Sequence, residues 1–292
     1  VMSESNIKLG SGAKLKVRGG GTQSTSKWAY APAPGVFTID KDAAQKLGPG
    51  GTPLPGADPN KDLIARYRLE ELGKRESETE TLAANLLIAG VIEHGDTWET
   101  EVSAGYNHVQ SKDVGVSGYA LTPVLNELIR TGEFNPFAPP GQRGSLNTAK
   151  YQPTEKTLSE LSSADLKASG EVGEISSGPV GLALGFSYTH QKYEDKFDVQ
   201  SVEGNVFGNA GSSGGGQRYT QAVYTELSIP LHRKLEWQIA GRYDNYSDFG
   251  DTFNPKTALR YQVIPQLLFR TSVGTGFKAP LMQDLYAASS LG

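Results

Sequence analysis

Apolar and polar residues alternate along most of this chain. In residues 98–107, Trp98, Val102 and Tyr106 share one face of an extended strand, and the residues between them are charged, polar or small. A period of two residues is typical of a β-strand with one apolar face. The same period marks nine segments: 63–69, 82–92, 98–107, 164–172, 180–189, 218–229, 235–244, 256–263 and 267–274. The pattern predicts an all-β, antiparallel protein.

The lengths of the segments and of their connections predict a membrane barrel. A segment of about ten residues is what a tilted strand needs to cross a bilayer, whereas a strand in a sandwich has about five or six. The turns at 93–96, 174–178, 230–234 and 264–266 are short, and the connections 111–158 and 191–217 are long. Short turns on one rim and long extracellular loops on the other are typical of a transmembrane β-barrel. We predict a partial barrel of about 9–11 strands.

The chain divides into two segments by composition. Residues 1–60 are rich in Gly, Pro, Ser and Thr, with weak strand signals at 14–18 and 36–39. They predict a loop-rich barrel segment, mostly long loops around one further strand pair. Residues 61–292 hold the predicted barrel strands and both long loops. The chain begins with Val1, has no signal-peptide pattern and ends in small residues, so we expect an internal piece of a longer protein.

One segment follows a helical period instead. Leu121, Val124, Leu125, Leu128 and Ile129 recur at helical spacing. Gly132 behind them is a helix-ending residue, so the spacing predicts one short amphipathic helix inside the long loop. Two interpretations stay open: the helix packs within its loop, or it covers a ligand at the barrel mouth. For the second interpretation the ligand-binding aromatic candidates are Tyr119, Phe134 and Phe137.

Composition narrows the chemistry. The net charge is −4, which argues against nucleic acid as a partner, and the absence of cysteine excludes disulfides and thiol chemistry. The four histidines are scattered and predict no metal site. Asp244, Asp248 and Asp251 surround Gly250 and could hold Ca²⁺ in a loop, although their spacing is not that of an EF-hand. We expect no cofactor and, without a recognisable Ser/His/Asp set, no enzyme.

The last third of the chain resembles a known family. ELSIPL at 226–231, GRYDNYSDFG at 241–250, NPK at 254–256, FRTSVGTGFKAP at 269–280 and QDLY at 283–286 stand in one order, after GEFNPF at 132–137 and GPVGLALG at 178–185. This succession resembles the barrel of TonB-dependent outer-membrane receptors. The resemblance implies a barrel of about 22 strands with an N-terminal plug, in the bacterial outer membrane. It also implies uptake of a scarce nutrient such as a siderophore, vitamin or sugar, with energy from the TonB complex.

This chain lacks a plug, a TonB box and enough strands to close such a barrel. We therefore expect TonB to act through a plug domain outside this chain, with a small-molecule ligand and outer-membrane lipid as further partners. Charged residues on the polar faces are expected to line the lumen rather than to perform acid–base chemistry. They are Arg66, Arg68, Glu99, Glu101, Arg218, Glu226, Arg242, Asp244 and Arg270.

Two other classes of protein remain as alternatives. A porin-like or autotransporter barrel segment would show the same strand pattern, and an upstream plug with a TonB box would favour the receptor. A soluble β-rich binding protein conflicts with apolar faces such as Val180, Leu182, Leu184, Phe186 and Tyr188, which would form a large apolar patch in water.

Overall fold

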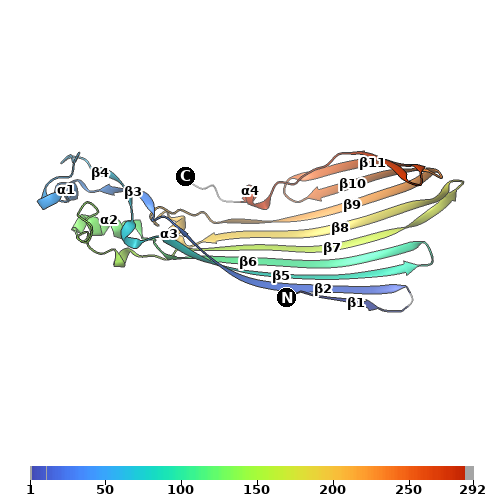
Figure 1. Cartoon of the computed structure of the whole chain (residues 1–292), viewed down its shortest axis with the longest axis horizontal. Helices are drawn as coiled ribbons and strands as arrows, with labels where there is room; N and C mark the ends of the chain where they lie inside the picture. The colour runs from blue at the N-terminus through green and yellow to red at the C-terminus, as the bar shows by residue number, and fades with distance from the viewer. Residues whose placement is uncertain (1, 11, 287–292) are drawn as a thin grey trace.

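A computed structural model describes residues 2–10 and 12–286 of the chain. Ten strands form one antiparallel sheet in the order β1-β2-β5-β6-β7-β8-β9-β10-β11-β12, and β3 pairs with β4 in a small second sheet. Short turns join neighbouring strands at one end of the large sheet, and the long connections gather at the other (Figure 1). The strands are β1 (Met2–Lys8), β2 (Ala13–Tyr30), β3 (Pro34–Ile39), β4 (Leu63–Arg68), β5 (Arg75–His94), β6 (Trp98–Ser117), β7 (Thr154–Ile175), β8 (Gly178–Phe197), β9 (Gly214–His232), β10 (Leu235–Tyr246), β11 (Gly250–Ile264) and β12 (Leu267–Gly274).

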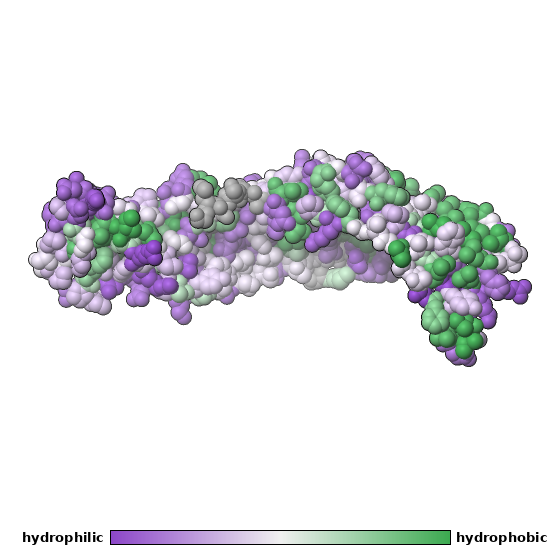
Figure 2. All heavy atoms as spheres, turned by 90° about the horizontal axis from the view of Figure 1, so that it is seen from above, coloured by the Kyte–Doolittle hydropathy of each residue, from purple (hydrophilic) through white to green (hydrophobic). Residues whose placement is uncertain are grey.

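Apolar side chains form a continuous band on one face of the large sheet. Val102 on β6 lies opposite Leu166 on β7, which lies opposite Phe186 on β8, and the row continues to Val223 on β9 and Tyr243 on β10. All five side chains are exposed. Figure 2 shows apolar side chains concentrated toward the turn end of the molecule. An exposed apolar band of this extent is typical of the lipid-facing surface of a transmembrane barrel. The predicted partial antiparallel β-barrel is confirmed.

The strands are about twice as long as the sequence predicted. Strands β5 to β9 have 19 to 22 residues, so each is about 65 Å long at 3.3 Å per residue, against about 30 Å for a bilayer core. The loops are accordingly shorter than the predicted 111–158 and 191–217, and span residues 118–153 and 198–213. Beyond the apolar band both faces of a strand are polar, so the two-residue period vanishes although the hydrogen-bonded ladder continues.

The prediction that residues 1–60 are mostly loops is wrong for residues 2–8 and 13–30, although the strand signals at 14–18 and 36–39 do lie in strands, β2 and β3. Strands β1 and β2 belong to the large sheet, and β2 pairs with β5 over its whole length. The face of β2 that shares the apolar band carries Leu15 and Val17 and then Gly19, Gly21 and Gln23. Such small and polar residues give little strand signal, and pairing with the apolar β5 decides the structure instead.

The structure also corrects the placement of Arg66 and Arg68. Both lie on β4, which pairs with β3 and not with a strand of the barrel sheet. They are therefore on no barrel strand, and the expectation that they line the lumen is wrong. Alternation shows that a segment is a strand, but it does not show which sheet the strand joins.

The predicted amphipathic helix is α2 (Thr122–Thr131). It buries Leu125, Leu128 and Ile129, and Gly132 ends it with φ +78°, a left-handed conformation that glycine adopts without a steric cost. Within the described residues no helix has both the length and the apolar character to cross a membrane. The other helices have three to five residues, too few for a periodic signal: α1 (Lys41–Ala44), α3 (Val199–Val202), α4 (Met282–Tyr286), and the 3-10 turns η1 (Pro49–Gly51), η2 (Glu70–Leu72) and η3 (Asn147–Ala149).

Candidate functional site

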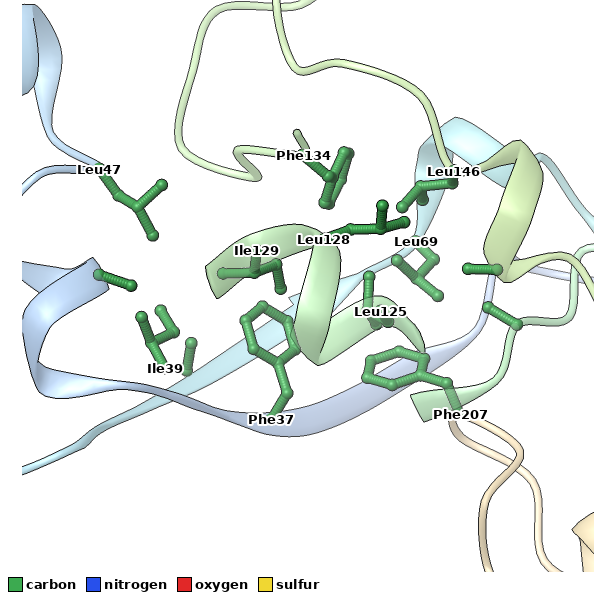
Figure 3. Packing of buried hydrophobic residues seen from close by; sticks show 14 of the residues in the cluster. Phe37, Ile39, Leu47, Leu69, Leu125, Leu128, Ile129, Phe134, Leu146 and Phe207 are labelled. Carbon is green, nitrogen blue, oxygen red and sulfur yellow. The ribbon is translucent and has the colours of Figure 1, made fainter. Parts of the chain in front are cut away.

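Three long connections pack into one compact body at the loop end of the sheet. We call it the loop module, and it comprises residues 31–74, 118–153 and 198–213. Phe37 from the first connection, Phe134 from the second and Phe207 from the third meet around α2 (Figure 3). Since all three aromatic side chains are at most 3% exposed, the connections share one hydrophobic core and behave as one body rather than as separate loops.

Polar contacts also join the three connections. The Asn135 side-chain amide donates to the Leu47 carbonyl at 2.8 Å, and Arg143 donates to the Glu71 carboxylate at 2.6 Å. The Phe207 amide donates to the carbonyl of Ala120 at 2.8 Å. The apolar face of α2 packs within the module, as the first interpretation of the helix expects. That the helix covers a ligand at the barrel mouth stays a prediction.

Asp198 ties the loop module to the sheet. Its carboxylate accepts hydrogen bonds from the Tyr151 hydroxyl at 2.7 Å, the Thr154 amide at 2.8 Å, and the Ser201 amide and hydroxyl at 3.0 and 2.8 Å. Burial raises the pKa of Asp198, but these four hydrogen bonds outweigh it and leave the pKa below its ordinary value. One carboxylate thus fixes the start of β7, the end of the second connection and the N-terminus of α3.

A methyl group at Gly35 is expected to disturb the core of the loop module. A Cβ at this position would lie 2.3 Å from the Phe207 ring, so Gly35→Ala has to displace Phe207, at a cost of about 1–3 kcal/mol for overpacking. We expect amide hydrogen exchange in α2 to be faster in this variant than in the natural protein. Gly90→Ala is the matched control, because nothing lies within 4 Å of a Cβ there. Unchanged exchange in Gly35→Ala would contradict the shared core.

The three aromatic ligand candidates have different surroundings. Phe134 is 0% exposed in the module core, so in this structure it offers no surface to a ligand and its assignment as a ligand contact is wrong. Tyr119 is buried, with its hydroxyl 3.2 Å from the Ser77 hydroxyl, and it also borders a cavity. Phe137 is 41% exposed. The roles of Tyr119 and Phe137 in ligand binding stay predictions.

A cavity of about 320 Å³ lies where the loop module meets the polar face of the sheet. Trp28, Tyr119 and Phe197 supply aromatic walls, and Asp113 and Glu155 supply carboxylates. The indole of Trp28 donates to the Thr79 hydroxyl at 3.3 Å, and that hydroxyl donates to Asp113 at 2.5 Å. Mixed aromatic and polar walls are typical of small-molecule sites. This cavity was not predicted from the sequence, since its residues come from five strands and two loops and meet only in the folded protein.

Carboxylates crowd together at this rim. Burial, and then the neighbouring carboxylates of Asp195 and Asp113, raise the pKa of Glu155 to about 7. Glu155 lies at the loop end of β7, well beyond the apolar band. A carboxyl group there changes its charge near neutral pH, although an ordinary glutamate is ionised above pH 5.

The outer ends of β6, β7 and β8 are therefore expected to become less stable as the pH rises. Glu155 keeps its proton up to about pH 7 in the folded protein, whereas in the unfolded chain it releases the proton near pH 4.5. The protonated carboxyl group therefore stabilises the folded rim fully below pH 4.5, and this stabilisation is lost as the pH rises through about 7. Amide exchange at residues 113–117 and 154–158 should be faster at pH 8 than at pH 5 after correction for intrinsic rates. Glu155→Gln should remove this difference, and Glu203→Gln in the loop module should keep it.

Seven of the predicted lumen residues share the polar face. Glu101 lies opposite Lys167, and Arg242 lies opposite Tyr224 and Asn254. Each of these residues is an odd number of positions from the apolar-band residues of its own strand, so it lies on the other face of the sheet. The same parity holds for the full set of Glu99, Glu101, Arg218, Glu226, Arg242, Asp244 and Arg270. That they line the lumen of a closed barrel stays a prediction.

Arg218 is a nearly buried charged residue of that face. Its side chain is 4% exposed and its Nε donates to both oxygens of Asp248, at 3.0 and 2.8 Å. Its Nη1 donates to the Pro280 carbonyl at 3.0 Å, and the Phe249 ring lies 5.0 Å from the guanidinium carbon. Tyr286 donates to Asp248 at 3.1 Å. Residues 275–286, which follow β12, are thereby held against β9.

The cluster around Arg218 joins two of the motifs that carry the family resemblance. Tyr246 and Phe249 come from the segment 241–250, and Phe277 comes from 269–280. Their rings stack or tilt against each other with centroids 4.3 to 6.0 Å apart. The sequence predicts Arg218 only as a lumen charge and does not predict Asp248 as its partner, because two residues 30 positions apart show no pairing signal.

Two of the three carboxylates in the acidic cluster form ion pairs with arginines. Asp244 pairs with Arg242 at 2.9 Å, and Asp248 pairs with Arg218. Across residues 2–10 and 12–286, no group of three or more His, Cys, Asp or Glu side chains is arranged to hold a metal ion. That this cluster holds Ca²⁺ in a loop stays a prediction.

These features define a class before any comparison is made: a membrane barrel with long, structured loops on one rim. A family model described as "TonB dependent receptor-like, beta-barrel" matches residues 10–291, so the chain belongs to the TonB-dependent receptor β-barrel family. This is a family of bacterial outer-membrane transporters and not of enzymes. No curated protein matches the chain.

One solved structure supports the fold. A chain in the structure of the RagAB peptide transporter matches with a TM-score of 0.51 at 10% identity, over 94% of this chain and 32% of that one. The present chain therefore spans about a third of that transporter chain. The translocator domain of the autotransporter NalP from Neisseria meningitidis gives a TM-score of 0.29 at 10% identity, over 98% of this chain and 81% of that domain, which is too low to support an argument.

Proposed function

We propose that this chain is part of an outer-membrane receptor that takes up a scarce nutrient with energy from the TonB complex. The observation that carries the proposal is the loop module: three connections that share one core at the rim of a barrel of the TonB-dependent receptor family. A preformed body at the mouth is suited to hold a specific ligand, because less ordering is needed on binding. The nutrient is a small molecule such as a siderophore, vitamin or sugar, and TonB acts through a plug domain.

Within this proposal, two places are the best candidates for ligand contact. One is the rim cavity with Trp28, Asp113 and Glu155, and the other is the exposed ring of Phe137 on the loop module. The charged residues of the polar face line the passage and contact the plug. Neither role requires a cofactor or a covalent step.

The energy source separates this proposal from a passive pore. Uptake of radiolabelled ferric siderophore, cobalamin and an oligosaccharide is measured in cells that carry the natural protein, with and without TonB. Accumulation that requires TonB is the expected result for at least one of the three. Passage of these solutes at equal rates with and without TonB would favour the porin-like or autotransporter alternative instead.

A further inference from the structure

The rim cavity is large enough for a small molecule or for one end of a larger nutrient. Its volume is about 320 Å³, at the lower end of the range of about 300–1,000 Å³ for ligand sites. The rings of Trp28 and Phe197 form part of its wall, and the carboxylates of Asp113 and Glu155 form another part. The character of these two parts indicates which chemical group fits between them.

Three carboxylates gather at the cavity from three neighbouring strands. Asp113 on β6 lies directly opposite Glu155 on β7. One row further down, Thr157 on β7 lies directly opposite Asp195 on β8. Directly opposite side chains have Cβ atoms about 4.5–5.5 Å apart. The strand pairing therefore concentrates negative charge on one side of the cavity.

The carboxylates lie on the polar face of the sheet. Asp113, Glu155 and Asp195 are each an odd number of positions from the apolar-band residues of their own strands, and no register shift intervenes. Successive side chains of a strand point to opposite faces. The three carboxylates thus share the face of the predicted lumen charges, where a ligand that enters the barrel passes.

The partners of these carboxylates in the protein are neutral. The Thr79 hydroxyl donates to Asp113 at 2.5 Å, and the Thr157 hydroxyl donates to Asp195 at 3.5 Å. Across residues 2–10 and 12–286, no Lys, Arg or His nitrogen lies within 4.0 Å of a carboxylate oxygen of Asp113, Glu155 or Asp195. All three side chains are half-buried, so the cavity has a negative wall without a cation from the described protein.

The raised pKa of Glu155 has the same origin. Burial and the charges of Asp195 and Asp113 make ionisation of Glu155 unfavourable. A cation a few ångströms from a carboxylate favours its charged form. A positively charged group in the cavity would therefore relieve the repulsion that the strand pairing creates.

The aromatic rings favour an organic cation. The face of an aromatic ring attracts an ammonium or guanidinium group that lies within about 6 Å of its centre. The Trp28 ring is held in place by the Tyr30 ring, whose centroid is 4.8 Å away, and by the hydrogen bond to Thr79. A group with both positive charge and apolar surface matches rings and carboxylates together.

We propose that the rim cavity binds the ammonium or guanidinium group of a nutrient between the rings of Trp28 and Phe197 and the carboxylates of Asp113, Glu155 and Asp195. The inference rests on the proposed function and narrows its substrate class to nutrients that carry an organic cation. The carboxylates attract the cation, and the rings replace part of its hydration.

The test is calorimetric titration of the purified natural protein in detergent. The probes are agmatine, choline and 3,3-dimethylbutan-1-ol, which has the shape of choline without its charge. At least one of the two cations should bind, and choline should bind about tenfold more tightly than the alcohol because only choline is attracted by the carboxylates. This comparison requires no variant. Failure of both cations to bind, or equal affinity for choline and the alcohol, would overturn the proposal.

The variant Asp113→Asn/Glu155→Gln/Asp195→Asn keeps the shape of the cavity and removes its negative charge. Its affinity for the cation that binds should be at least tenfold lower, because a charged partner is replaced by a neutral amide. The matched control Asp42→Asn/Glu133→Gln/Glu203→Gln changes three exposed carboxylates of the loop module and should bind like the natural protein. An unchanged affinity in the cavity variant would sink the proposal.

The pH dependence of choline binding gives a second measurement, because the charge of choline does not change with pH. Glu155 faces Asp113 on β6, Asp195 and the Tyr193 hydroxyl on β8, and Tyr119 of the loop module. As Glu155 ionises, the affinity for choline should increase from pH 5.5 to pH 8. An affinity that falls over this range would contradict the assignment of the carboxylates.

The binding and uptake experiments can fail separately. TonB-dependent uptake of an uncharged oligosaccharide by a protein that binds neither cation would overturn this inference and leave the proposed function intact. Cation binding by a protein whose uptake does not require TonB would leave the cavity assignment intact and overturn the proposed energy source.

Discussion

Replacing Arg218 with methionine is expected to release residues 275–286 from the sheet and to lower the free energy of unfolding by about 3–5 kcal/mol. Arg218 and Asp248 are both nearly buried, and the guanidinium also holds the Pro280 carbonyl. Without the guanidinium, the Asp248 carboxylate is a nearly buried charge with no cationic partner. An unpaired buried charge strongly destabilises the folded state. Faster trypsin cleavage after Lys278 and a lower urea midpoint would show both effects.

Two further variants separate the buried charge from a general loss of arginine. Arg218→Met/Asp248→Leu removes both charges and should recover much of the stability, since an apolar pair of similar volume replaces the ion pair. Arg233→Met changes an exposed arginine in the β9–β10 turn and should have little effect. If the double variant were less stable than Arg218→Met, the ion pair would not be the reason for the effect.

Leu184→Arg is expected to prevent assembly of the barrel in the membrane. Leu184 lies on the apolar face of β8, opposite Ala168 on one side and Thr225 on the other, and is exposed. An arginine on the lipid face near the midplane costs about 2–4 kcal/mol. The measurement is the amount of folded, heat-modifiable protein in the membrane fraction.

The control for this variant is Ala183→Ser. Ala183 is the adjacent residue on the polar face and lies opposite Glu226 on β9, so a hydroxyl there meets a polar environment and assembly should be unchanged. Normal amounts of folded Leu184→Arg protein would contradict the assignment of the apolar face to lipid.

The sequence predicted the facing of the barrel strands well, because each face is set by a local rule. The row from Val102 to Tyr243 consists of positions whose alternation is visible in the sequence, and pairing brings these positions into one band. The lengths were not predictable in the same way. Above the band, segments such as 76–81 are polar on both faces, and only the ladder with a neighbouring strand makes them strands.

The site was less predictable because it depends on contacts between distant segments. Phe134 is recognisable in the sequence as an aromatic residue in a loop, but whether such a ring is buried depends on a core that also takes residues from the other two connections. The partnership of Arg218 with Asp248 and the crowding of Glu155 with Asp195 likewise arise only when strands meet. A helix such as α2 was predictable, since its apolar period and its terminal glycine are local.

The shared core of the loop module limits how such a barrel can acquire a new specificity. A single connection grafted from a relative would bring only one of the three groups of side chains that form the core. Phe207 would then lose Gly35, against which its ring packs, or α2 would lose its aromatic neighbours. Recombination that preserves folding has to exchange residues 31–74, 118–153 and 198–213 as a set. Diversification is then expected to proceed by point substitutions on the outer surface of the module, while the three connections are inherited together.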